Sequence, residues 1–382
     1  MYKKVDNLRG RMHTVIISIA CFLLMAAQPA FADNPDVLED VDGLEREDDK
    51  FDITYLIESK ITDAHQWHIV DIGERKVYLY LPVILINHHN GWSPQVFISS
   101  KFDHGKEIVQ KGDNYYKLYK NTIYLTDAEG SLTYDAEGNI TNLKPLDISI
   151  TKNVVAIFFV IFLMLAIFIS IAKTYKQRAG MAPKGFQSLM EPVILFVRDE
   201  VARNNIGEKK YRKFMPYLLT LFFFILLNNL MGLVPIFPGK ANVTGNIAVT
   251  LTLALFTLIA VNFNGTKAYW GHIFWPPGMP VPIKLLMAVV ELIGVFIKPF
   301  ALMVRLFANM TAGHILMMSI FGLIFLLGPA MGSGGAMGIS IATVLFAVFM
   351  NLLKLVVAFL QAFIFTLLSA IFIGQAVDEG HH

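Results

Sequence analysis

Apolar residues in the second half of the chain form continuous stretches that are long enough to cross a lipid bilayer. A helix needs about 20 such residues to span the hydrocarbon core. Among residues 214–376, only seven are Lys, Arg, Asp or Glu, so we expect this part to be embedded in lipid. The apolar pattern predicts five spans, at Val154–Ala172, Phe214–Pro235, Asn246–Phe263, Lys284–Leu327 and Met337–Gln375.

The last two predicted helices are about twice as long as an upright span requires. Each has roughly 40 residues, and neither contains a polar turn that would divide it into two spans. We therefore predict a steeply tilted antiparallel hairpin, with its turn at Gly332–Gly335. Such a hairpin presents a long oblique face to a partner within the bilayer.

The N-terminal part has a mixed, more polar pattern. Residues 33–150 contain four strand-like runs, at Lys76–Ile86, Gln95–Phe102, Tyr116–Thr126 and Ser131–Ile140. The predicted fold is an all-α polytopic membrane protein preceded by a small β-rich extramembrane region. We divide the chain into a signal peptide (1–32), a periplasmic N-terminal region (33–150) and a membrane domain (151–382).

The signal peptide is predicted from three features of residues 1–32. Basic residues precede an apolar run at Val15–Ala27, and Ala30-Phe31-Ala32 provides a cleavage site of the A-x-A type. A retained signal anchor is the alternative. The only cysteine, Cys21, lies inside the apolar run, so cleavage would leave a chain without thiol chemistry.

The charges predict the orientation of the chain and exclude one class of partner. Residues 173–213 carry ten Lys or Arg and four acids, which places this segment in the cytoplasm by the positive-inside rule. The N-terminal region is then periplasmic, and five spans place the C-terminus in the cytoplasm of an inner-membrane protein. The net charge of +2 gives no indication of a nucleic-acid partner.

Arg305 is the most informative charge, because it lies in the middle of a predicted span. An ionisable residue within a span is costly and suggests function. Counted outward from Ser333, Arg305 and Gln361 are both 28 residues away, and His314 and Lys354 are 19 and 21 residues away. We therefore expect each pair to be level in the hairpin.

These residues suggest a proton path in two halves. His314 lies about 180° around the helix from Arg305, whereas Asn309 shares the face of Arg305. Glu291 lies about 21 Å from Arg305 toward the cytoplasmic end. Arginine does not deprotonate, but it forces a nearby carboxylic acid to ionise. Arg305 between His314 and Glu291 would therefore block direct leakage.

Ordinary structural roles remain open for several of these residues. Glu291 and Lys298 lie near a predicted helix start and are consistent with interfacial positions. His314 alone is equally consistent with a buried core histidine. His65, His68, His88 and His89 lack the spacing of a metal site, so we expect no metal and no cofactor.

Four segments resemble motifs of one family, subunit a of F-type ATP synthases. The resemblance covers about residues 150–376, and the N-terminal extension is similar to the form seen in Bacteroidota-type bacteria. The segments are Arg305-Leu-Phe-Ala-Asn-Met-Thr-Ala-Gly-His314, Leu360-Gln-Ala-Phe-Ile-Phe365, Asn229-Leu-Met-Gly-Leu-Val-Pro235 and Ala241–Thr252.

The resemblance implies a role for each site residue. Arg305 would face the essential carboxylate of the rotating c-ring (subunit c), with Asn309 and Gln361 as polar neighbours. His314, Lys354 and Asn246 would line the half-channel open to the periplasm, and Glu291 the cytoplasmic one. Subunit b of the stalk and other ATP synthase subunits would be further partners. The pair His314 and Lys354 departs from the family pattern, in which one of the two positions is acidic.

The sequence is consistent with three classes of function. The first is a non-catalytic stator subunit that guides protons to the rotor, and the second is a stand-alone ion transporter or channel. The predicted spans show no inverted repeat of the kind that many transporters have. The third, an intramembrane hydrolase using Ser333, lacks a base at a defined spacing. The first function is the one that we predict.

Overall fold

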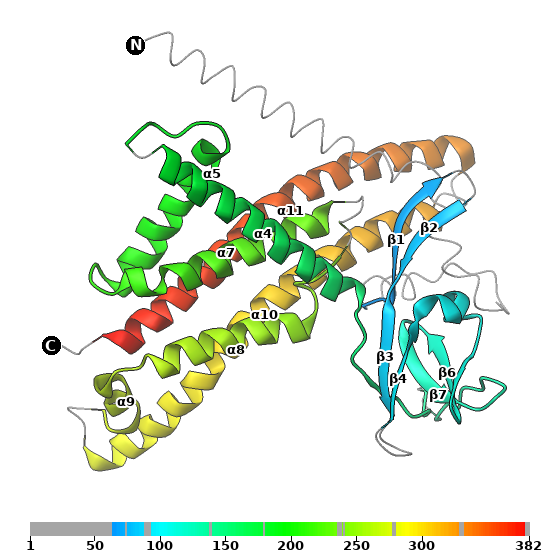
Figure 1. Ribbon diagram of the computed structural model, residues 1–382, viewed down its shortest axis with the longest axis horizontal. Coiled ribbons are helices and arrows are strands. Elements are labelled where there is room, and N and C mark those ends of the chain that lie inside the picture. Colours follow the sequence, from blue (N-terminus) through cyan, green and yellow to red (C-terminus); the bar gives the residue numbers. More distant parts are fainter. Residues whose placement is uncertain are drawn as a thin grey trace, which may run out of the picture. The chain divides into compact units, whose positions relative to one another are not determined.

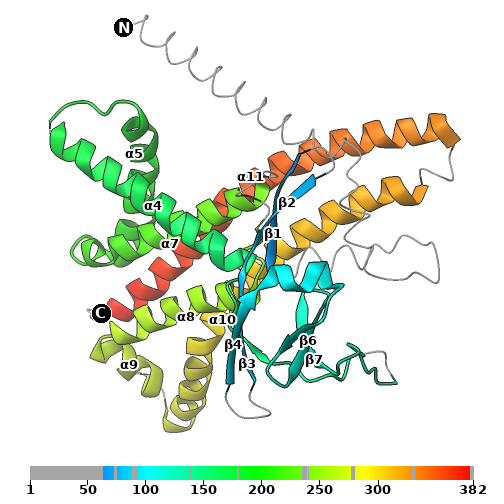
Figure 2. The same ribbon diagram turned by 45° about the vertical axis from the view of Figure 1, so that its right-hand side comes forward.

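The computed structural model describes residues 63–378 apart from short gaps (Figures 1 and 2). The predicted signal peptide lies outside the described residues, as do His88 and His89. The contacts within the chain divide it into two compact units. One runs to Val155 and includes 231–241 and 313–355; the other includes 156–230, 242–312 and the chain from 356 onward. The gaps are residues 73–74, 88–92, 137–139, 179, 235–238, 240, 277–279 and 328–331.

Residues 63–150, called the β region below, contain antiparallel strands in three small groups. β1 (Gln66–Ile72) pairs with β2 (Arg75–Tyr80). β3 (Pro82–Asn87) lies between β4 (Ser93–Ile98) and β8 (Leu146–Asp147). A third sheet contains β5 (Val109–Lys111), β6 (Asn114–Tyr119) and β7 (Thr122–Thr126).

Alternating side chains on these strands build one small core. Along β3, every second residue is buried, as expected for a strand with one face turned inward. The helical turn η2 (Ser99–Gly105) adds Phe102, whose ring packs edge-on against Phe97 at 5.4 Å. The core residues are Val83, Leu85, Phe97, Phe102, Val109, Tyr116 and Ile123.

The strand predictions for the β region are right in type, but their bounds are wrong. Lys76–Ile86 is divided at Leu81 between β2 and β3, and Gln95–Phe102 ends in the helical turn η2. The run Tyr116–Thr126 is a hairpin, because Lys120 and Asn121 have φ values of 48° and 60°, the left-handed conformation of a two-residue turn. The run Ser131–Ile140 forms a single bridge, between Tyr134 and Ile140. The Asn142 amide accepts a hydrogen bond from the Thr133 N–H and donates one to the Ser131 carbonyl, in place of strand partners.

The remaining elements are helices. Four of them, or five if the bent pair α8 and α9 counts as one span, are long and apolar enough to cross a membrane. The helices are α4 (Lys152–Gln177), α5 (Phe186–Phe196), the π-helical η3 (Val197–Arg203), α6 (Asn204–Ile206), α7 (Tyr211–Leu233), α8 (Ile247–Phe263), α9 (Lys267–Phe274), α10 (Val281–Leu327) and α11 (Gly332–Val377).

The two C-terminal helices have the unusual length predicted from the apolar pattern. α10 contains 47 residues and α11 contains 46. At 1.5 Å per residue, each is about 70 Å long, more than twice the ~30 Å of a hydrocarbon core. The predicted turn is misplaced, because α10 ends at Leu327 and Gly332–Gly335 already form the beginning of α11.

Polar side chains join the helices of the second unit in its apolar interior. The Asn229 side chain of α7 accepts a hydrogen bond from the Thr244 hydroxyl at 2.6 Å and donates to the Ala358 carbonyl of α11 at 3.3 Å. Thr257 of α8 bonds to Tyr217 of α7 and to Ser369 of α11. Because an unpaired polar group in lipid is costly, such bonds hold α7, α8 and α11 in register.

Phe102→Ala tests the core of the β region. Removal of this fully buried ring should cost roughly 3–5 kcal/mol of stability. Hydrogen exchange of β3, β4 and β6 in the reconstituted protein should accelerate accordingly. Val96→Ala is the matched control, since Val96 is 61% exposed on β4 and should change stability by less than about 0.5 kcal/mol. Equal exchange in the two variants would contradict this core.

Asp147 gives the β region a pH dependence. Burial alone would raise the pKa of Asp147, but hydrogen bonds from His65 and Ser149 outweigh burial and lower it. A carboxyl whose folded pKa is depressed contributes stability that is present above its unfolded pKa of about 3.9 and is lost as the pH falls through the folded pKa. Hydrogen exchange of β3 and β8 should therefore accelerate below about pH 4, and Asp147→Asn should flatten this dependence. An unchanged profile in the variant would exclude Asp147 as the titrating group.

Candidate functional site

Arg305 lies on α10 with its side chain exposed at the surface of the chain. Leu302 and Leu306, on the neighbouring positions of the helix, are buried and fix which face turns inward. Within the described part of the chain, the guanidinium has neither a hydrogen bond nor an ion pair. A permanent charge on a spanning helix is costly in lipid, so this face of α10 must meet water or a partner.

Small residues surround Arg305 on its exposed face. Ala301, Ala308 and Ala312 lie four residues before and three and seven residues after Arg305, and all three are exposed. These spacings place them on the same side of the helix as the arginine. Small side chains allow a neighbouring helix to approach closely in a membrane. The surroundings of Arg305 therefore fit a helical partner better than they fit open water.

The two predicted polar neighbours of Arg305 differ in their surroundings. Gln361 is buried on α11 and Asn309 is half-buried on α10. The Lys298 ammonium lies 5.5 Å from the centre of the Phe372 ring and 3.3 Å from Gln375 Oε1. Antiparallel pairing from these contacts places Arg305 level with residues about 365–368 of α11. Gln361 therefore lies one to two turns nearer the start of α11, and is not level with Arg305 as the count from Ser333 predicted. Among the described residues, no hydrogen bond joins Arg305 to either amide.

His314 and Lys354 come close together in the first unit, as the sequence count predicted. A Cβ atom placed on Gly313 would lie 3.5 Å from Lys354 Cε, so the lysine stem passes beside the glycine. Both side chains are half-buried. The structure therefore brings two basic groups together at this position, without an acid between them among the residues described.

The sequence analysis did not single out Lys152, a further cation of the first unit, which is the first residue of α4. Lys152 lies more than 160 positions before His314 in the chain, so no local pattern in the sequence links the two residues.

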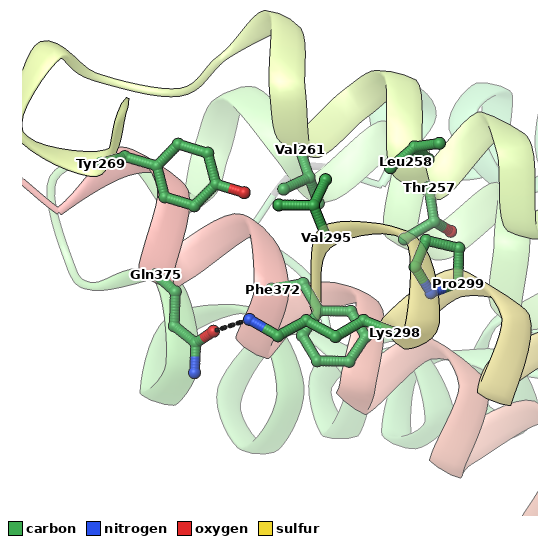
Figure 3. A pocket seen from close by; sticks show the side chains of 9 residues that line it. All are labelled: Thr257, Leu258, Val261, Tyr269, Val295, Lys298, Pro299, Phe372 and Gln375. Carbon is green, nitrogen blue, oxygen red and sulfur yellow. Dashed lines mark hydrogen bonds between the residues drawn. The ribbon is translucent and has the colours of Figure 1, made fainter. Parts of the chain in front are cut away.

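Glu291 lies on α10 next to a pocket in the second unit. Tyr269 of α9 points into that pocket (Figure 3). Glu291 lies one turn before Val295, which also lines the pocket. The pocket has a volume of about 300 Å³ including its opening. It is lined by Thr257, Leu258, Val261, Tyr269, Val295, Lys298, Pro299, Phe372 and Gln375.

Asn246 has a structural role at the start of α8. Its side-chain oxygen accepts a hydrogen bond from the Ala248 N–H at 2.9 Å, the geometry of a helix N-cap. The side chain is half-buried. Among the residues that the structure describes, no cluster of three His, Cys, Asp or Glu side chains is suited to hold a metal ion.

Comparison with known proteins identifies the family of the membrane part. Residues 154–374 match the model of the family described as ATP synthase A chain, and residues 56–148 match a domain of unknown function. A protein named ATP synthase subunit a from Chloroherpeton thalassium is 47% identical over 240 residues, which cover 62% of this chain and 69% of the relative.

Two further relatives have comparable similarity. A protein named ATP synthase subunit a 2 from Prosthecochloris aestuarii is 46% identical over 242 residues, 62% of this chain and 71% of the relative. The ATP synthase subunit a of Myxococcus xanthus is 41% identical over 251 residues, 62% of this chain and 76% of the relative. With the family model matching more than half of its residues, this multi-pass membrane chain belongs to the ATP synthase A chain family.

Proposed function

We propose that the chain is the stator subunit that guides protons to and from the rotor of an F-type ATP synthase. In this role it carries out no bond-breaking chemistry itself. Its partners are the c-ring, the subunit b stalk and the other subunits of the complex, within a bacterial inner membrane. The observation that carries the proposal is the exposed, unpaired Arg305, surrounded by small residues on a spanning helix.

Arg305 acts as an electrostatic barrier in this mechanism. When a rotor carboxylic acid arrives beside the guanidinium, the positive charge favours the carboxylate, so the acid releases its proton. The guanidinium cannot accept that proton or pass it on, because arginine does not deprotonate in proteins. A proton therefore cannot cross directly from one half-channel to the other. It crosses only while bound to a rotor carboxyl that turns away from Arg305.

The two half-channels are assigned to the groups on either side of Arg305. His314 and Lys354 belong to the periplasmic half, with Asn246 contributing a polar surface. Glu291 and the pocket beside it belong to the cytoplasmic half, where a released proton leaves. Asn309 and Gln361 provide polar groups near Arg305. The proximity of Lys354 to His314 and the pocket beside Glu291 support these assignments.

The proposed orientation follows from the positive charges between α4 and α7. Residues 173–213 carry ten Lys or Arg against four acids. Cytoplasmic segments are enriched in such residues, so this segment faces the cytoplasm and the β region faces the periplasm. The C-terminus then lies in the cytoplasm.

Arg305→Ala tests the stator function against the alternative of a stand-alone transporter. In inverted membrane vesicles, ATP-driven acidification should fall by at least about 100-fold. The reason is that the barrier to direct proton passage between the half-channels depends on this one preorganised charge. Lys284→Ala removes another cation from α10 and is the matched control, which should pump normally. Wild-type pumping by Arg305→Ala would contradict the proposal.

Lys354→Ala tests the entry half-path. ATP synthesis should slow several-fold without an increase in passive proton leak, because the variant alters the supply of protons and leaves Arg305 in place. Leu353→Ala changes the adjacent, exposed position and should have no such effect. If the synthesis rates of Lys354→Ala match those of the wild type at every periplasmic pH, Lys354 is a structural residue.

A further inference from the structure

The sheet formed by β4, β3 and β8 is apolar on both of its faces. One face carries the core residues Val83, Leu85 and Phe97, which lie on the side of β6 and β7 (Figure 1). The other face, called the apolar sheet face below, consists of the alternate residues on the same strands. They are Pro82, Ile84 and Ile86 of β3, Pro94, Val96 and Ile98 of β4, and Leu146, Ile148 and Ile150 of β8 and the segment after it. All nine side chains are apolar, whereas a sheet face in contact with water usually carries polar residues.

The strand pairing makes the apolar sheet face continuous. β3 pairs with β4 along one edge and with β8 along the other, so Ile84 and Ile86 lie in its middle. The Ile148 N–H donates to the Ile84 carbonyl at 2.9 Å, and the Ile150 N–H donates to the Pro82 carbonyl at 3.2 Å, which extends the pairing beyond β8. The spacing of strands and residues gives this face an area of roughly 240 Å². Its large exposed side chains are Val96, Ile98, Leu146 and Ile148.

The apolar sheet face is attached directly to the start of the first spanning helix. Ile150 lies two residues before Lys152, where α4 begins, so the edge of the face is within about 7 Å of the helix. Asp63 Oδ2 accepts a hydrogen bond from the Thr151 hydroxyl at 2.6 Å, and Asp63 Oδ1 accepts one from the Asn153 N–H at 3.1 Å. These bonds hold the segment that joins the sheet to the helix. The face is therefore kept beside the point where α4 enters the membrane.

The size of the apolar sheet face favours lipid over a protein as the group that covers it. A stable protein interface buries about 800 Å² on each partner, roughly three times the area of this face. A bilayer has no such minimum here, because α4 already anchors the chain and keeps the face at a high effective concentration beside the membrane. The exposed side chains of α4, such as Phe158 and Phe162, are also apolar. The chain thus carries exposed apolar residues on both sides of the point where α4 begins.

We propose that the apolar sheet face binds the surface of the phospholipid bilayer at the side where α4 begins, as a second and shallow membrane attachment of the chain. Its side chains enter the boundary between headgroups and acyl chains, a depth of about 5–10 Å. The backbone groups between the three strands stay hydrogen-bonded within the sheet, so the strand pairing is kept in the lipid. The sheet of β5, β6 and β7 then faces away from the bilayer, into water.

The test is fluorescence quenching in the full chain, assembled with the other ATP synthase subunits in vesicles of phosphatidylethanolamine and phosphatidylglycerol. Cys21→Ser removes the native thiol, and Val96→Cys carries a fluorophore on the apolar sheet face. Phospholipids brominated along their acyl chains should reduce its fluorescence roughly twofold, since the label reaches the acyl boundary. Aqueous iodide should quench it little.

Gln110→Cys is the matched control, because Gln110 is exposed on β5 next to the buried core residue Val109 and so points away from the core. A fluorophore at this position should be quenched by iodide and unaffected by brominated lipid. If iodide quenches the labels at positions 96 and 110 equally, the face lies in water and the proposal is overturned. If neither quencher reaches position 96, a protein subunit covers the face, which also overturns the assignment to lipid.

A second pair of variants separates binding of the face from mere closeness to the membrane. Ile98→Cys places the fluorophore on the same face, and Val96→Asp beside it introduces a charge that is costly to bury in lipid. Quenching of the Ile98→Cys label by brominated lipid should fall at least about twofold when Val96→Asp is added. Unchanged quenching would mean that the tether alone brings the label near the bilayer, and the proposal would fail. If Val96→Cys does not assemble, Ile98→Cys alone gives the comparison with Gln110→Cys.

Discussion

Placing a permanent charge among apolar side chains costs free energy, and this cost constrains the arrangement of the membrane helices. Arg305 lies on an apolar helix, has no partner within the described chain and is exposed beside three alanines. Lipid cannot solvate such a charge at low cost, and the guanidinium cannot lose its proton. The face of α10 therefore needs water or a partner at this position. The proposed place beside a rotor carboxylate would meet that need.

Two further features bear on how the face of α10 that carries Arg305 is positioned. They are the length of α10 and α11 and the hydrogen bonds between polar side chains of the helices. Two helices of about 70 Å must lie obliquely in a core of about 30 Å, which spreads their exposed face across the membrane. Asn229, Thr257 and Ser369 join α7, α8 and α11 through hydrogen bonds that are costly to break in lipid. The contact between Lys298 and Gln375 joins α10, which carries Arg305, to α11.

The sequence predicted the features that depend on composition and spacing. Long apolar runs indicated α10 and α11, and the count along the hairpin indicated that His314 and Lys354 lie close together. It misplaced the turn at Gly332–Gly335, because glycine is tolerated in spanning helices, where leaving the backbone unpaired is worse. It also missed the hydrogen bonds by which Asp63 holds Thr151 and Asn153 at the start of α4. Contacts of that kind follow from tertiary structure and leave no local pattern.

Disulfide cross-linking in the assembled complex tests most directly whether the Arg305 face meets the rotor. Ala308→Cys introduces a thiol three residues from Arg305 on its exposed face, and the only native cysteine, Cys21, lies in the predicted signal peptide. Paired with a cysteine one turn from the rotor carboxylate, it should form a disulfide with the rotor subunit under mild oxidation. Phe162→Cys on α4, which is also exposed, should not. A rotor cross-link from position 162 together with none from position 308 would contradict the account.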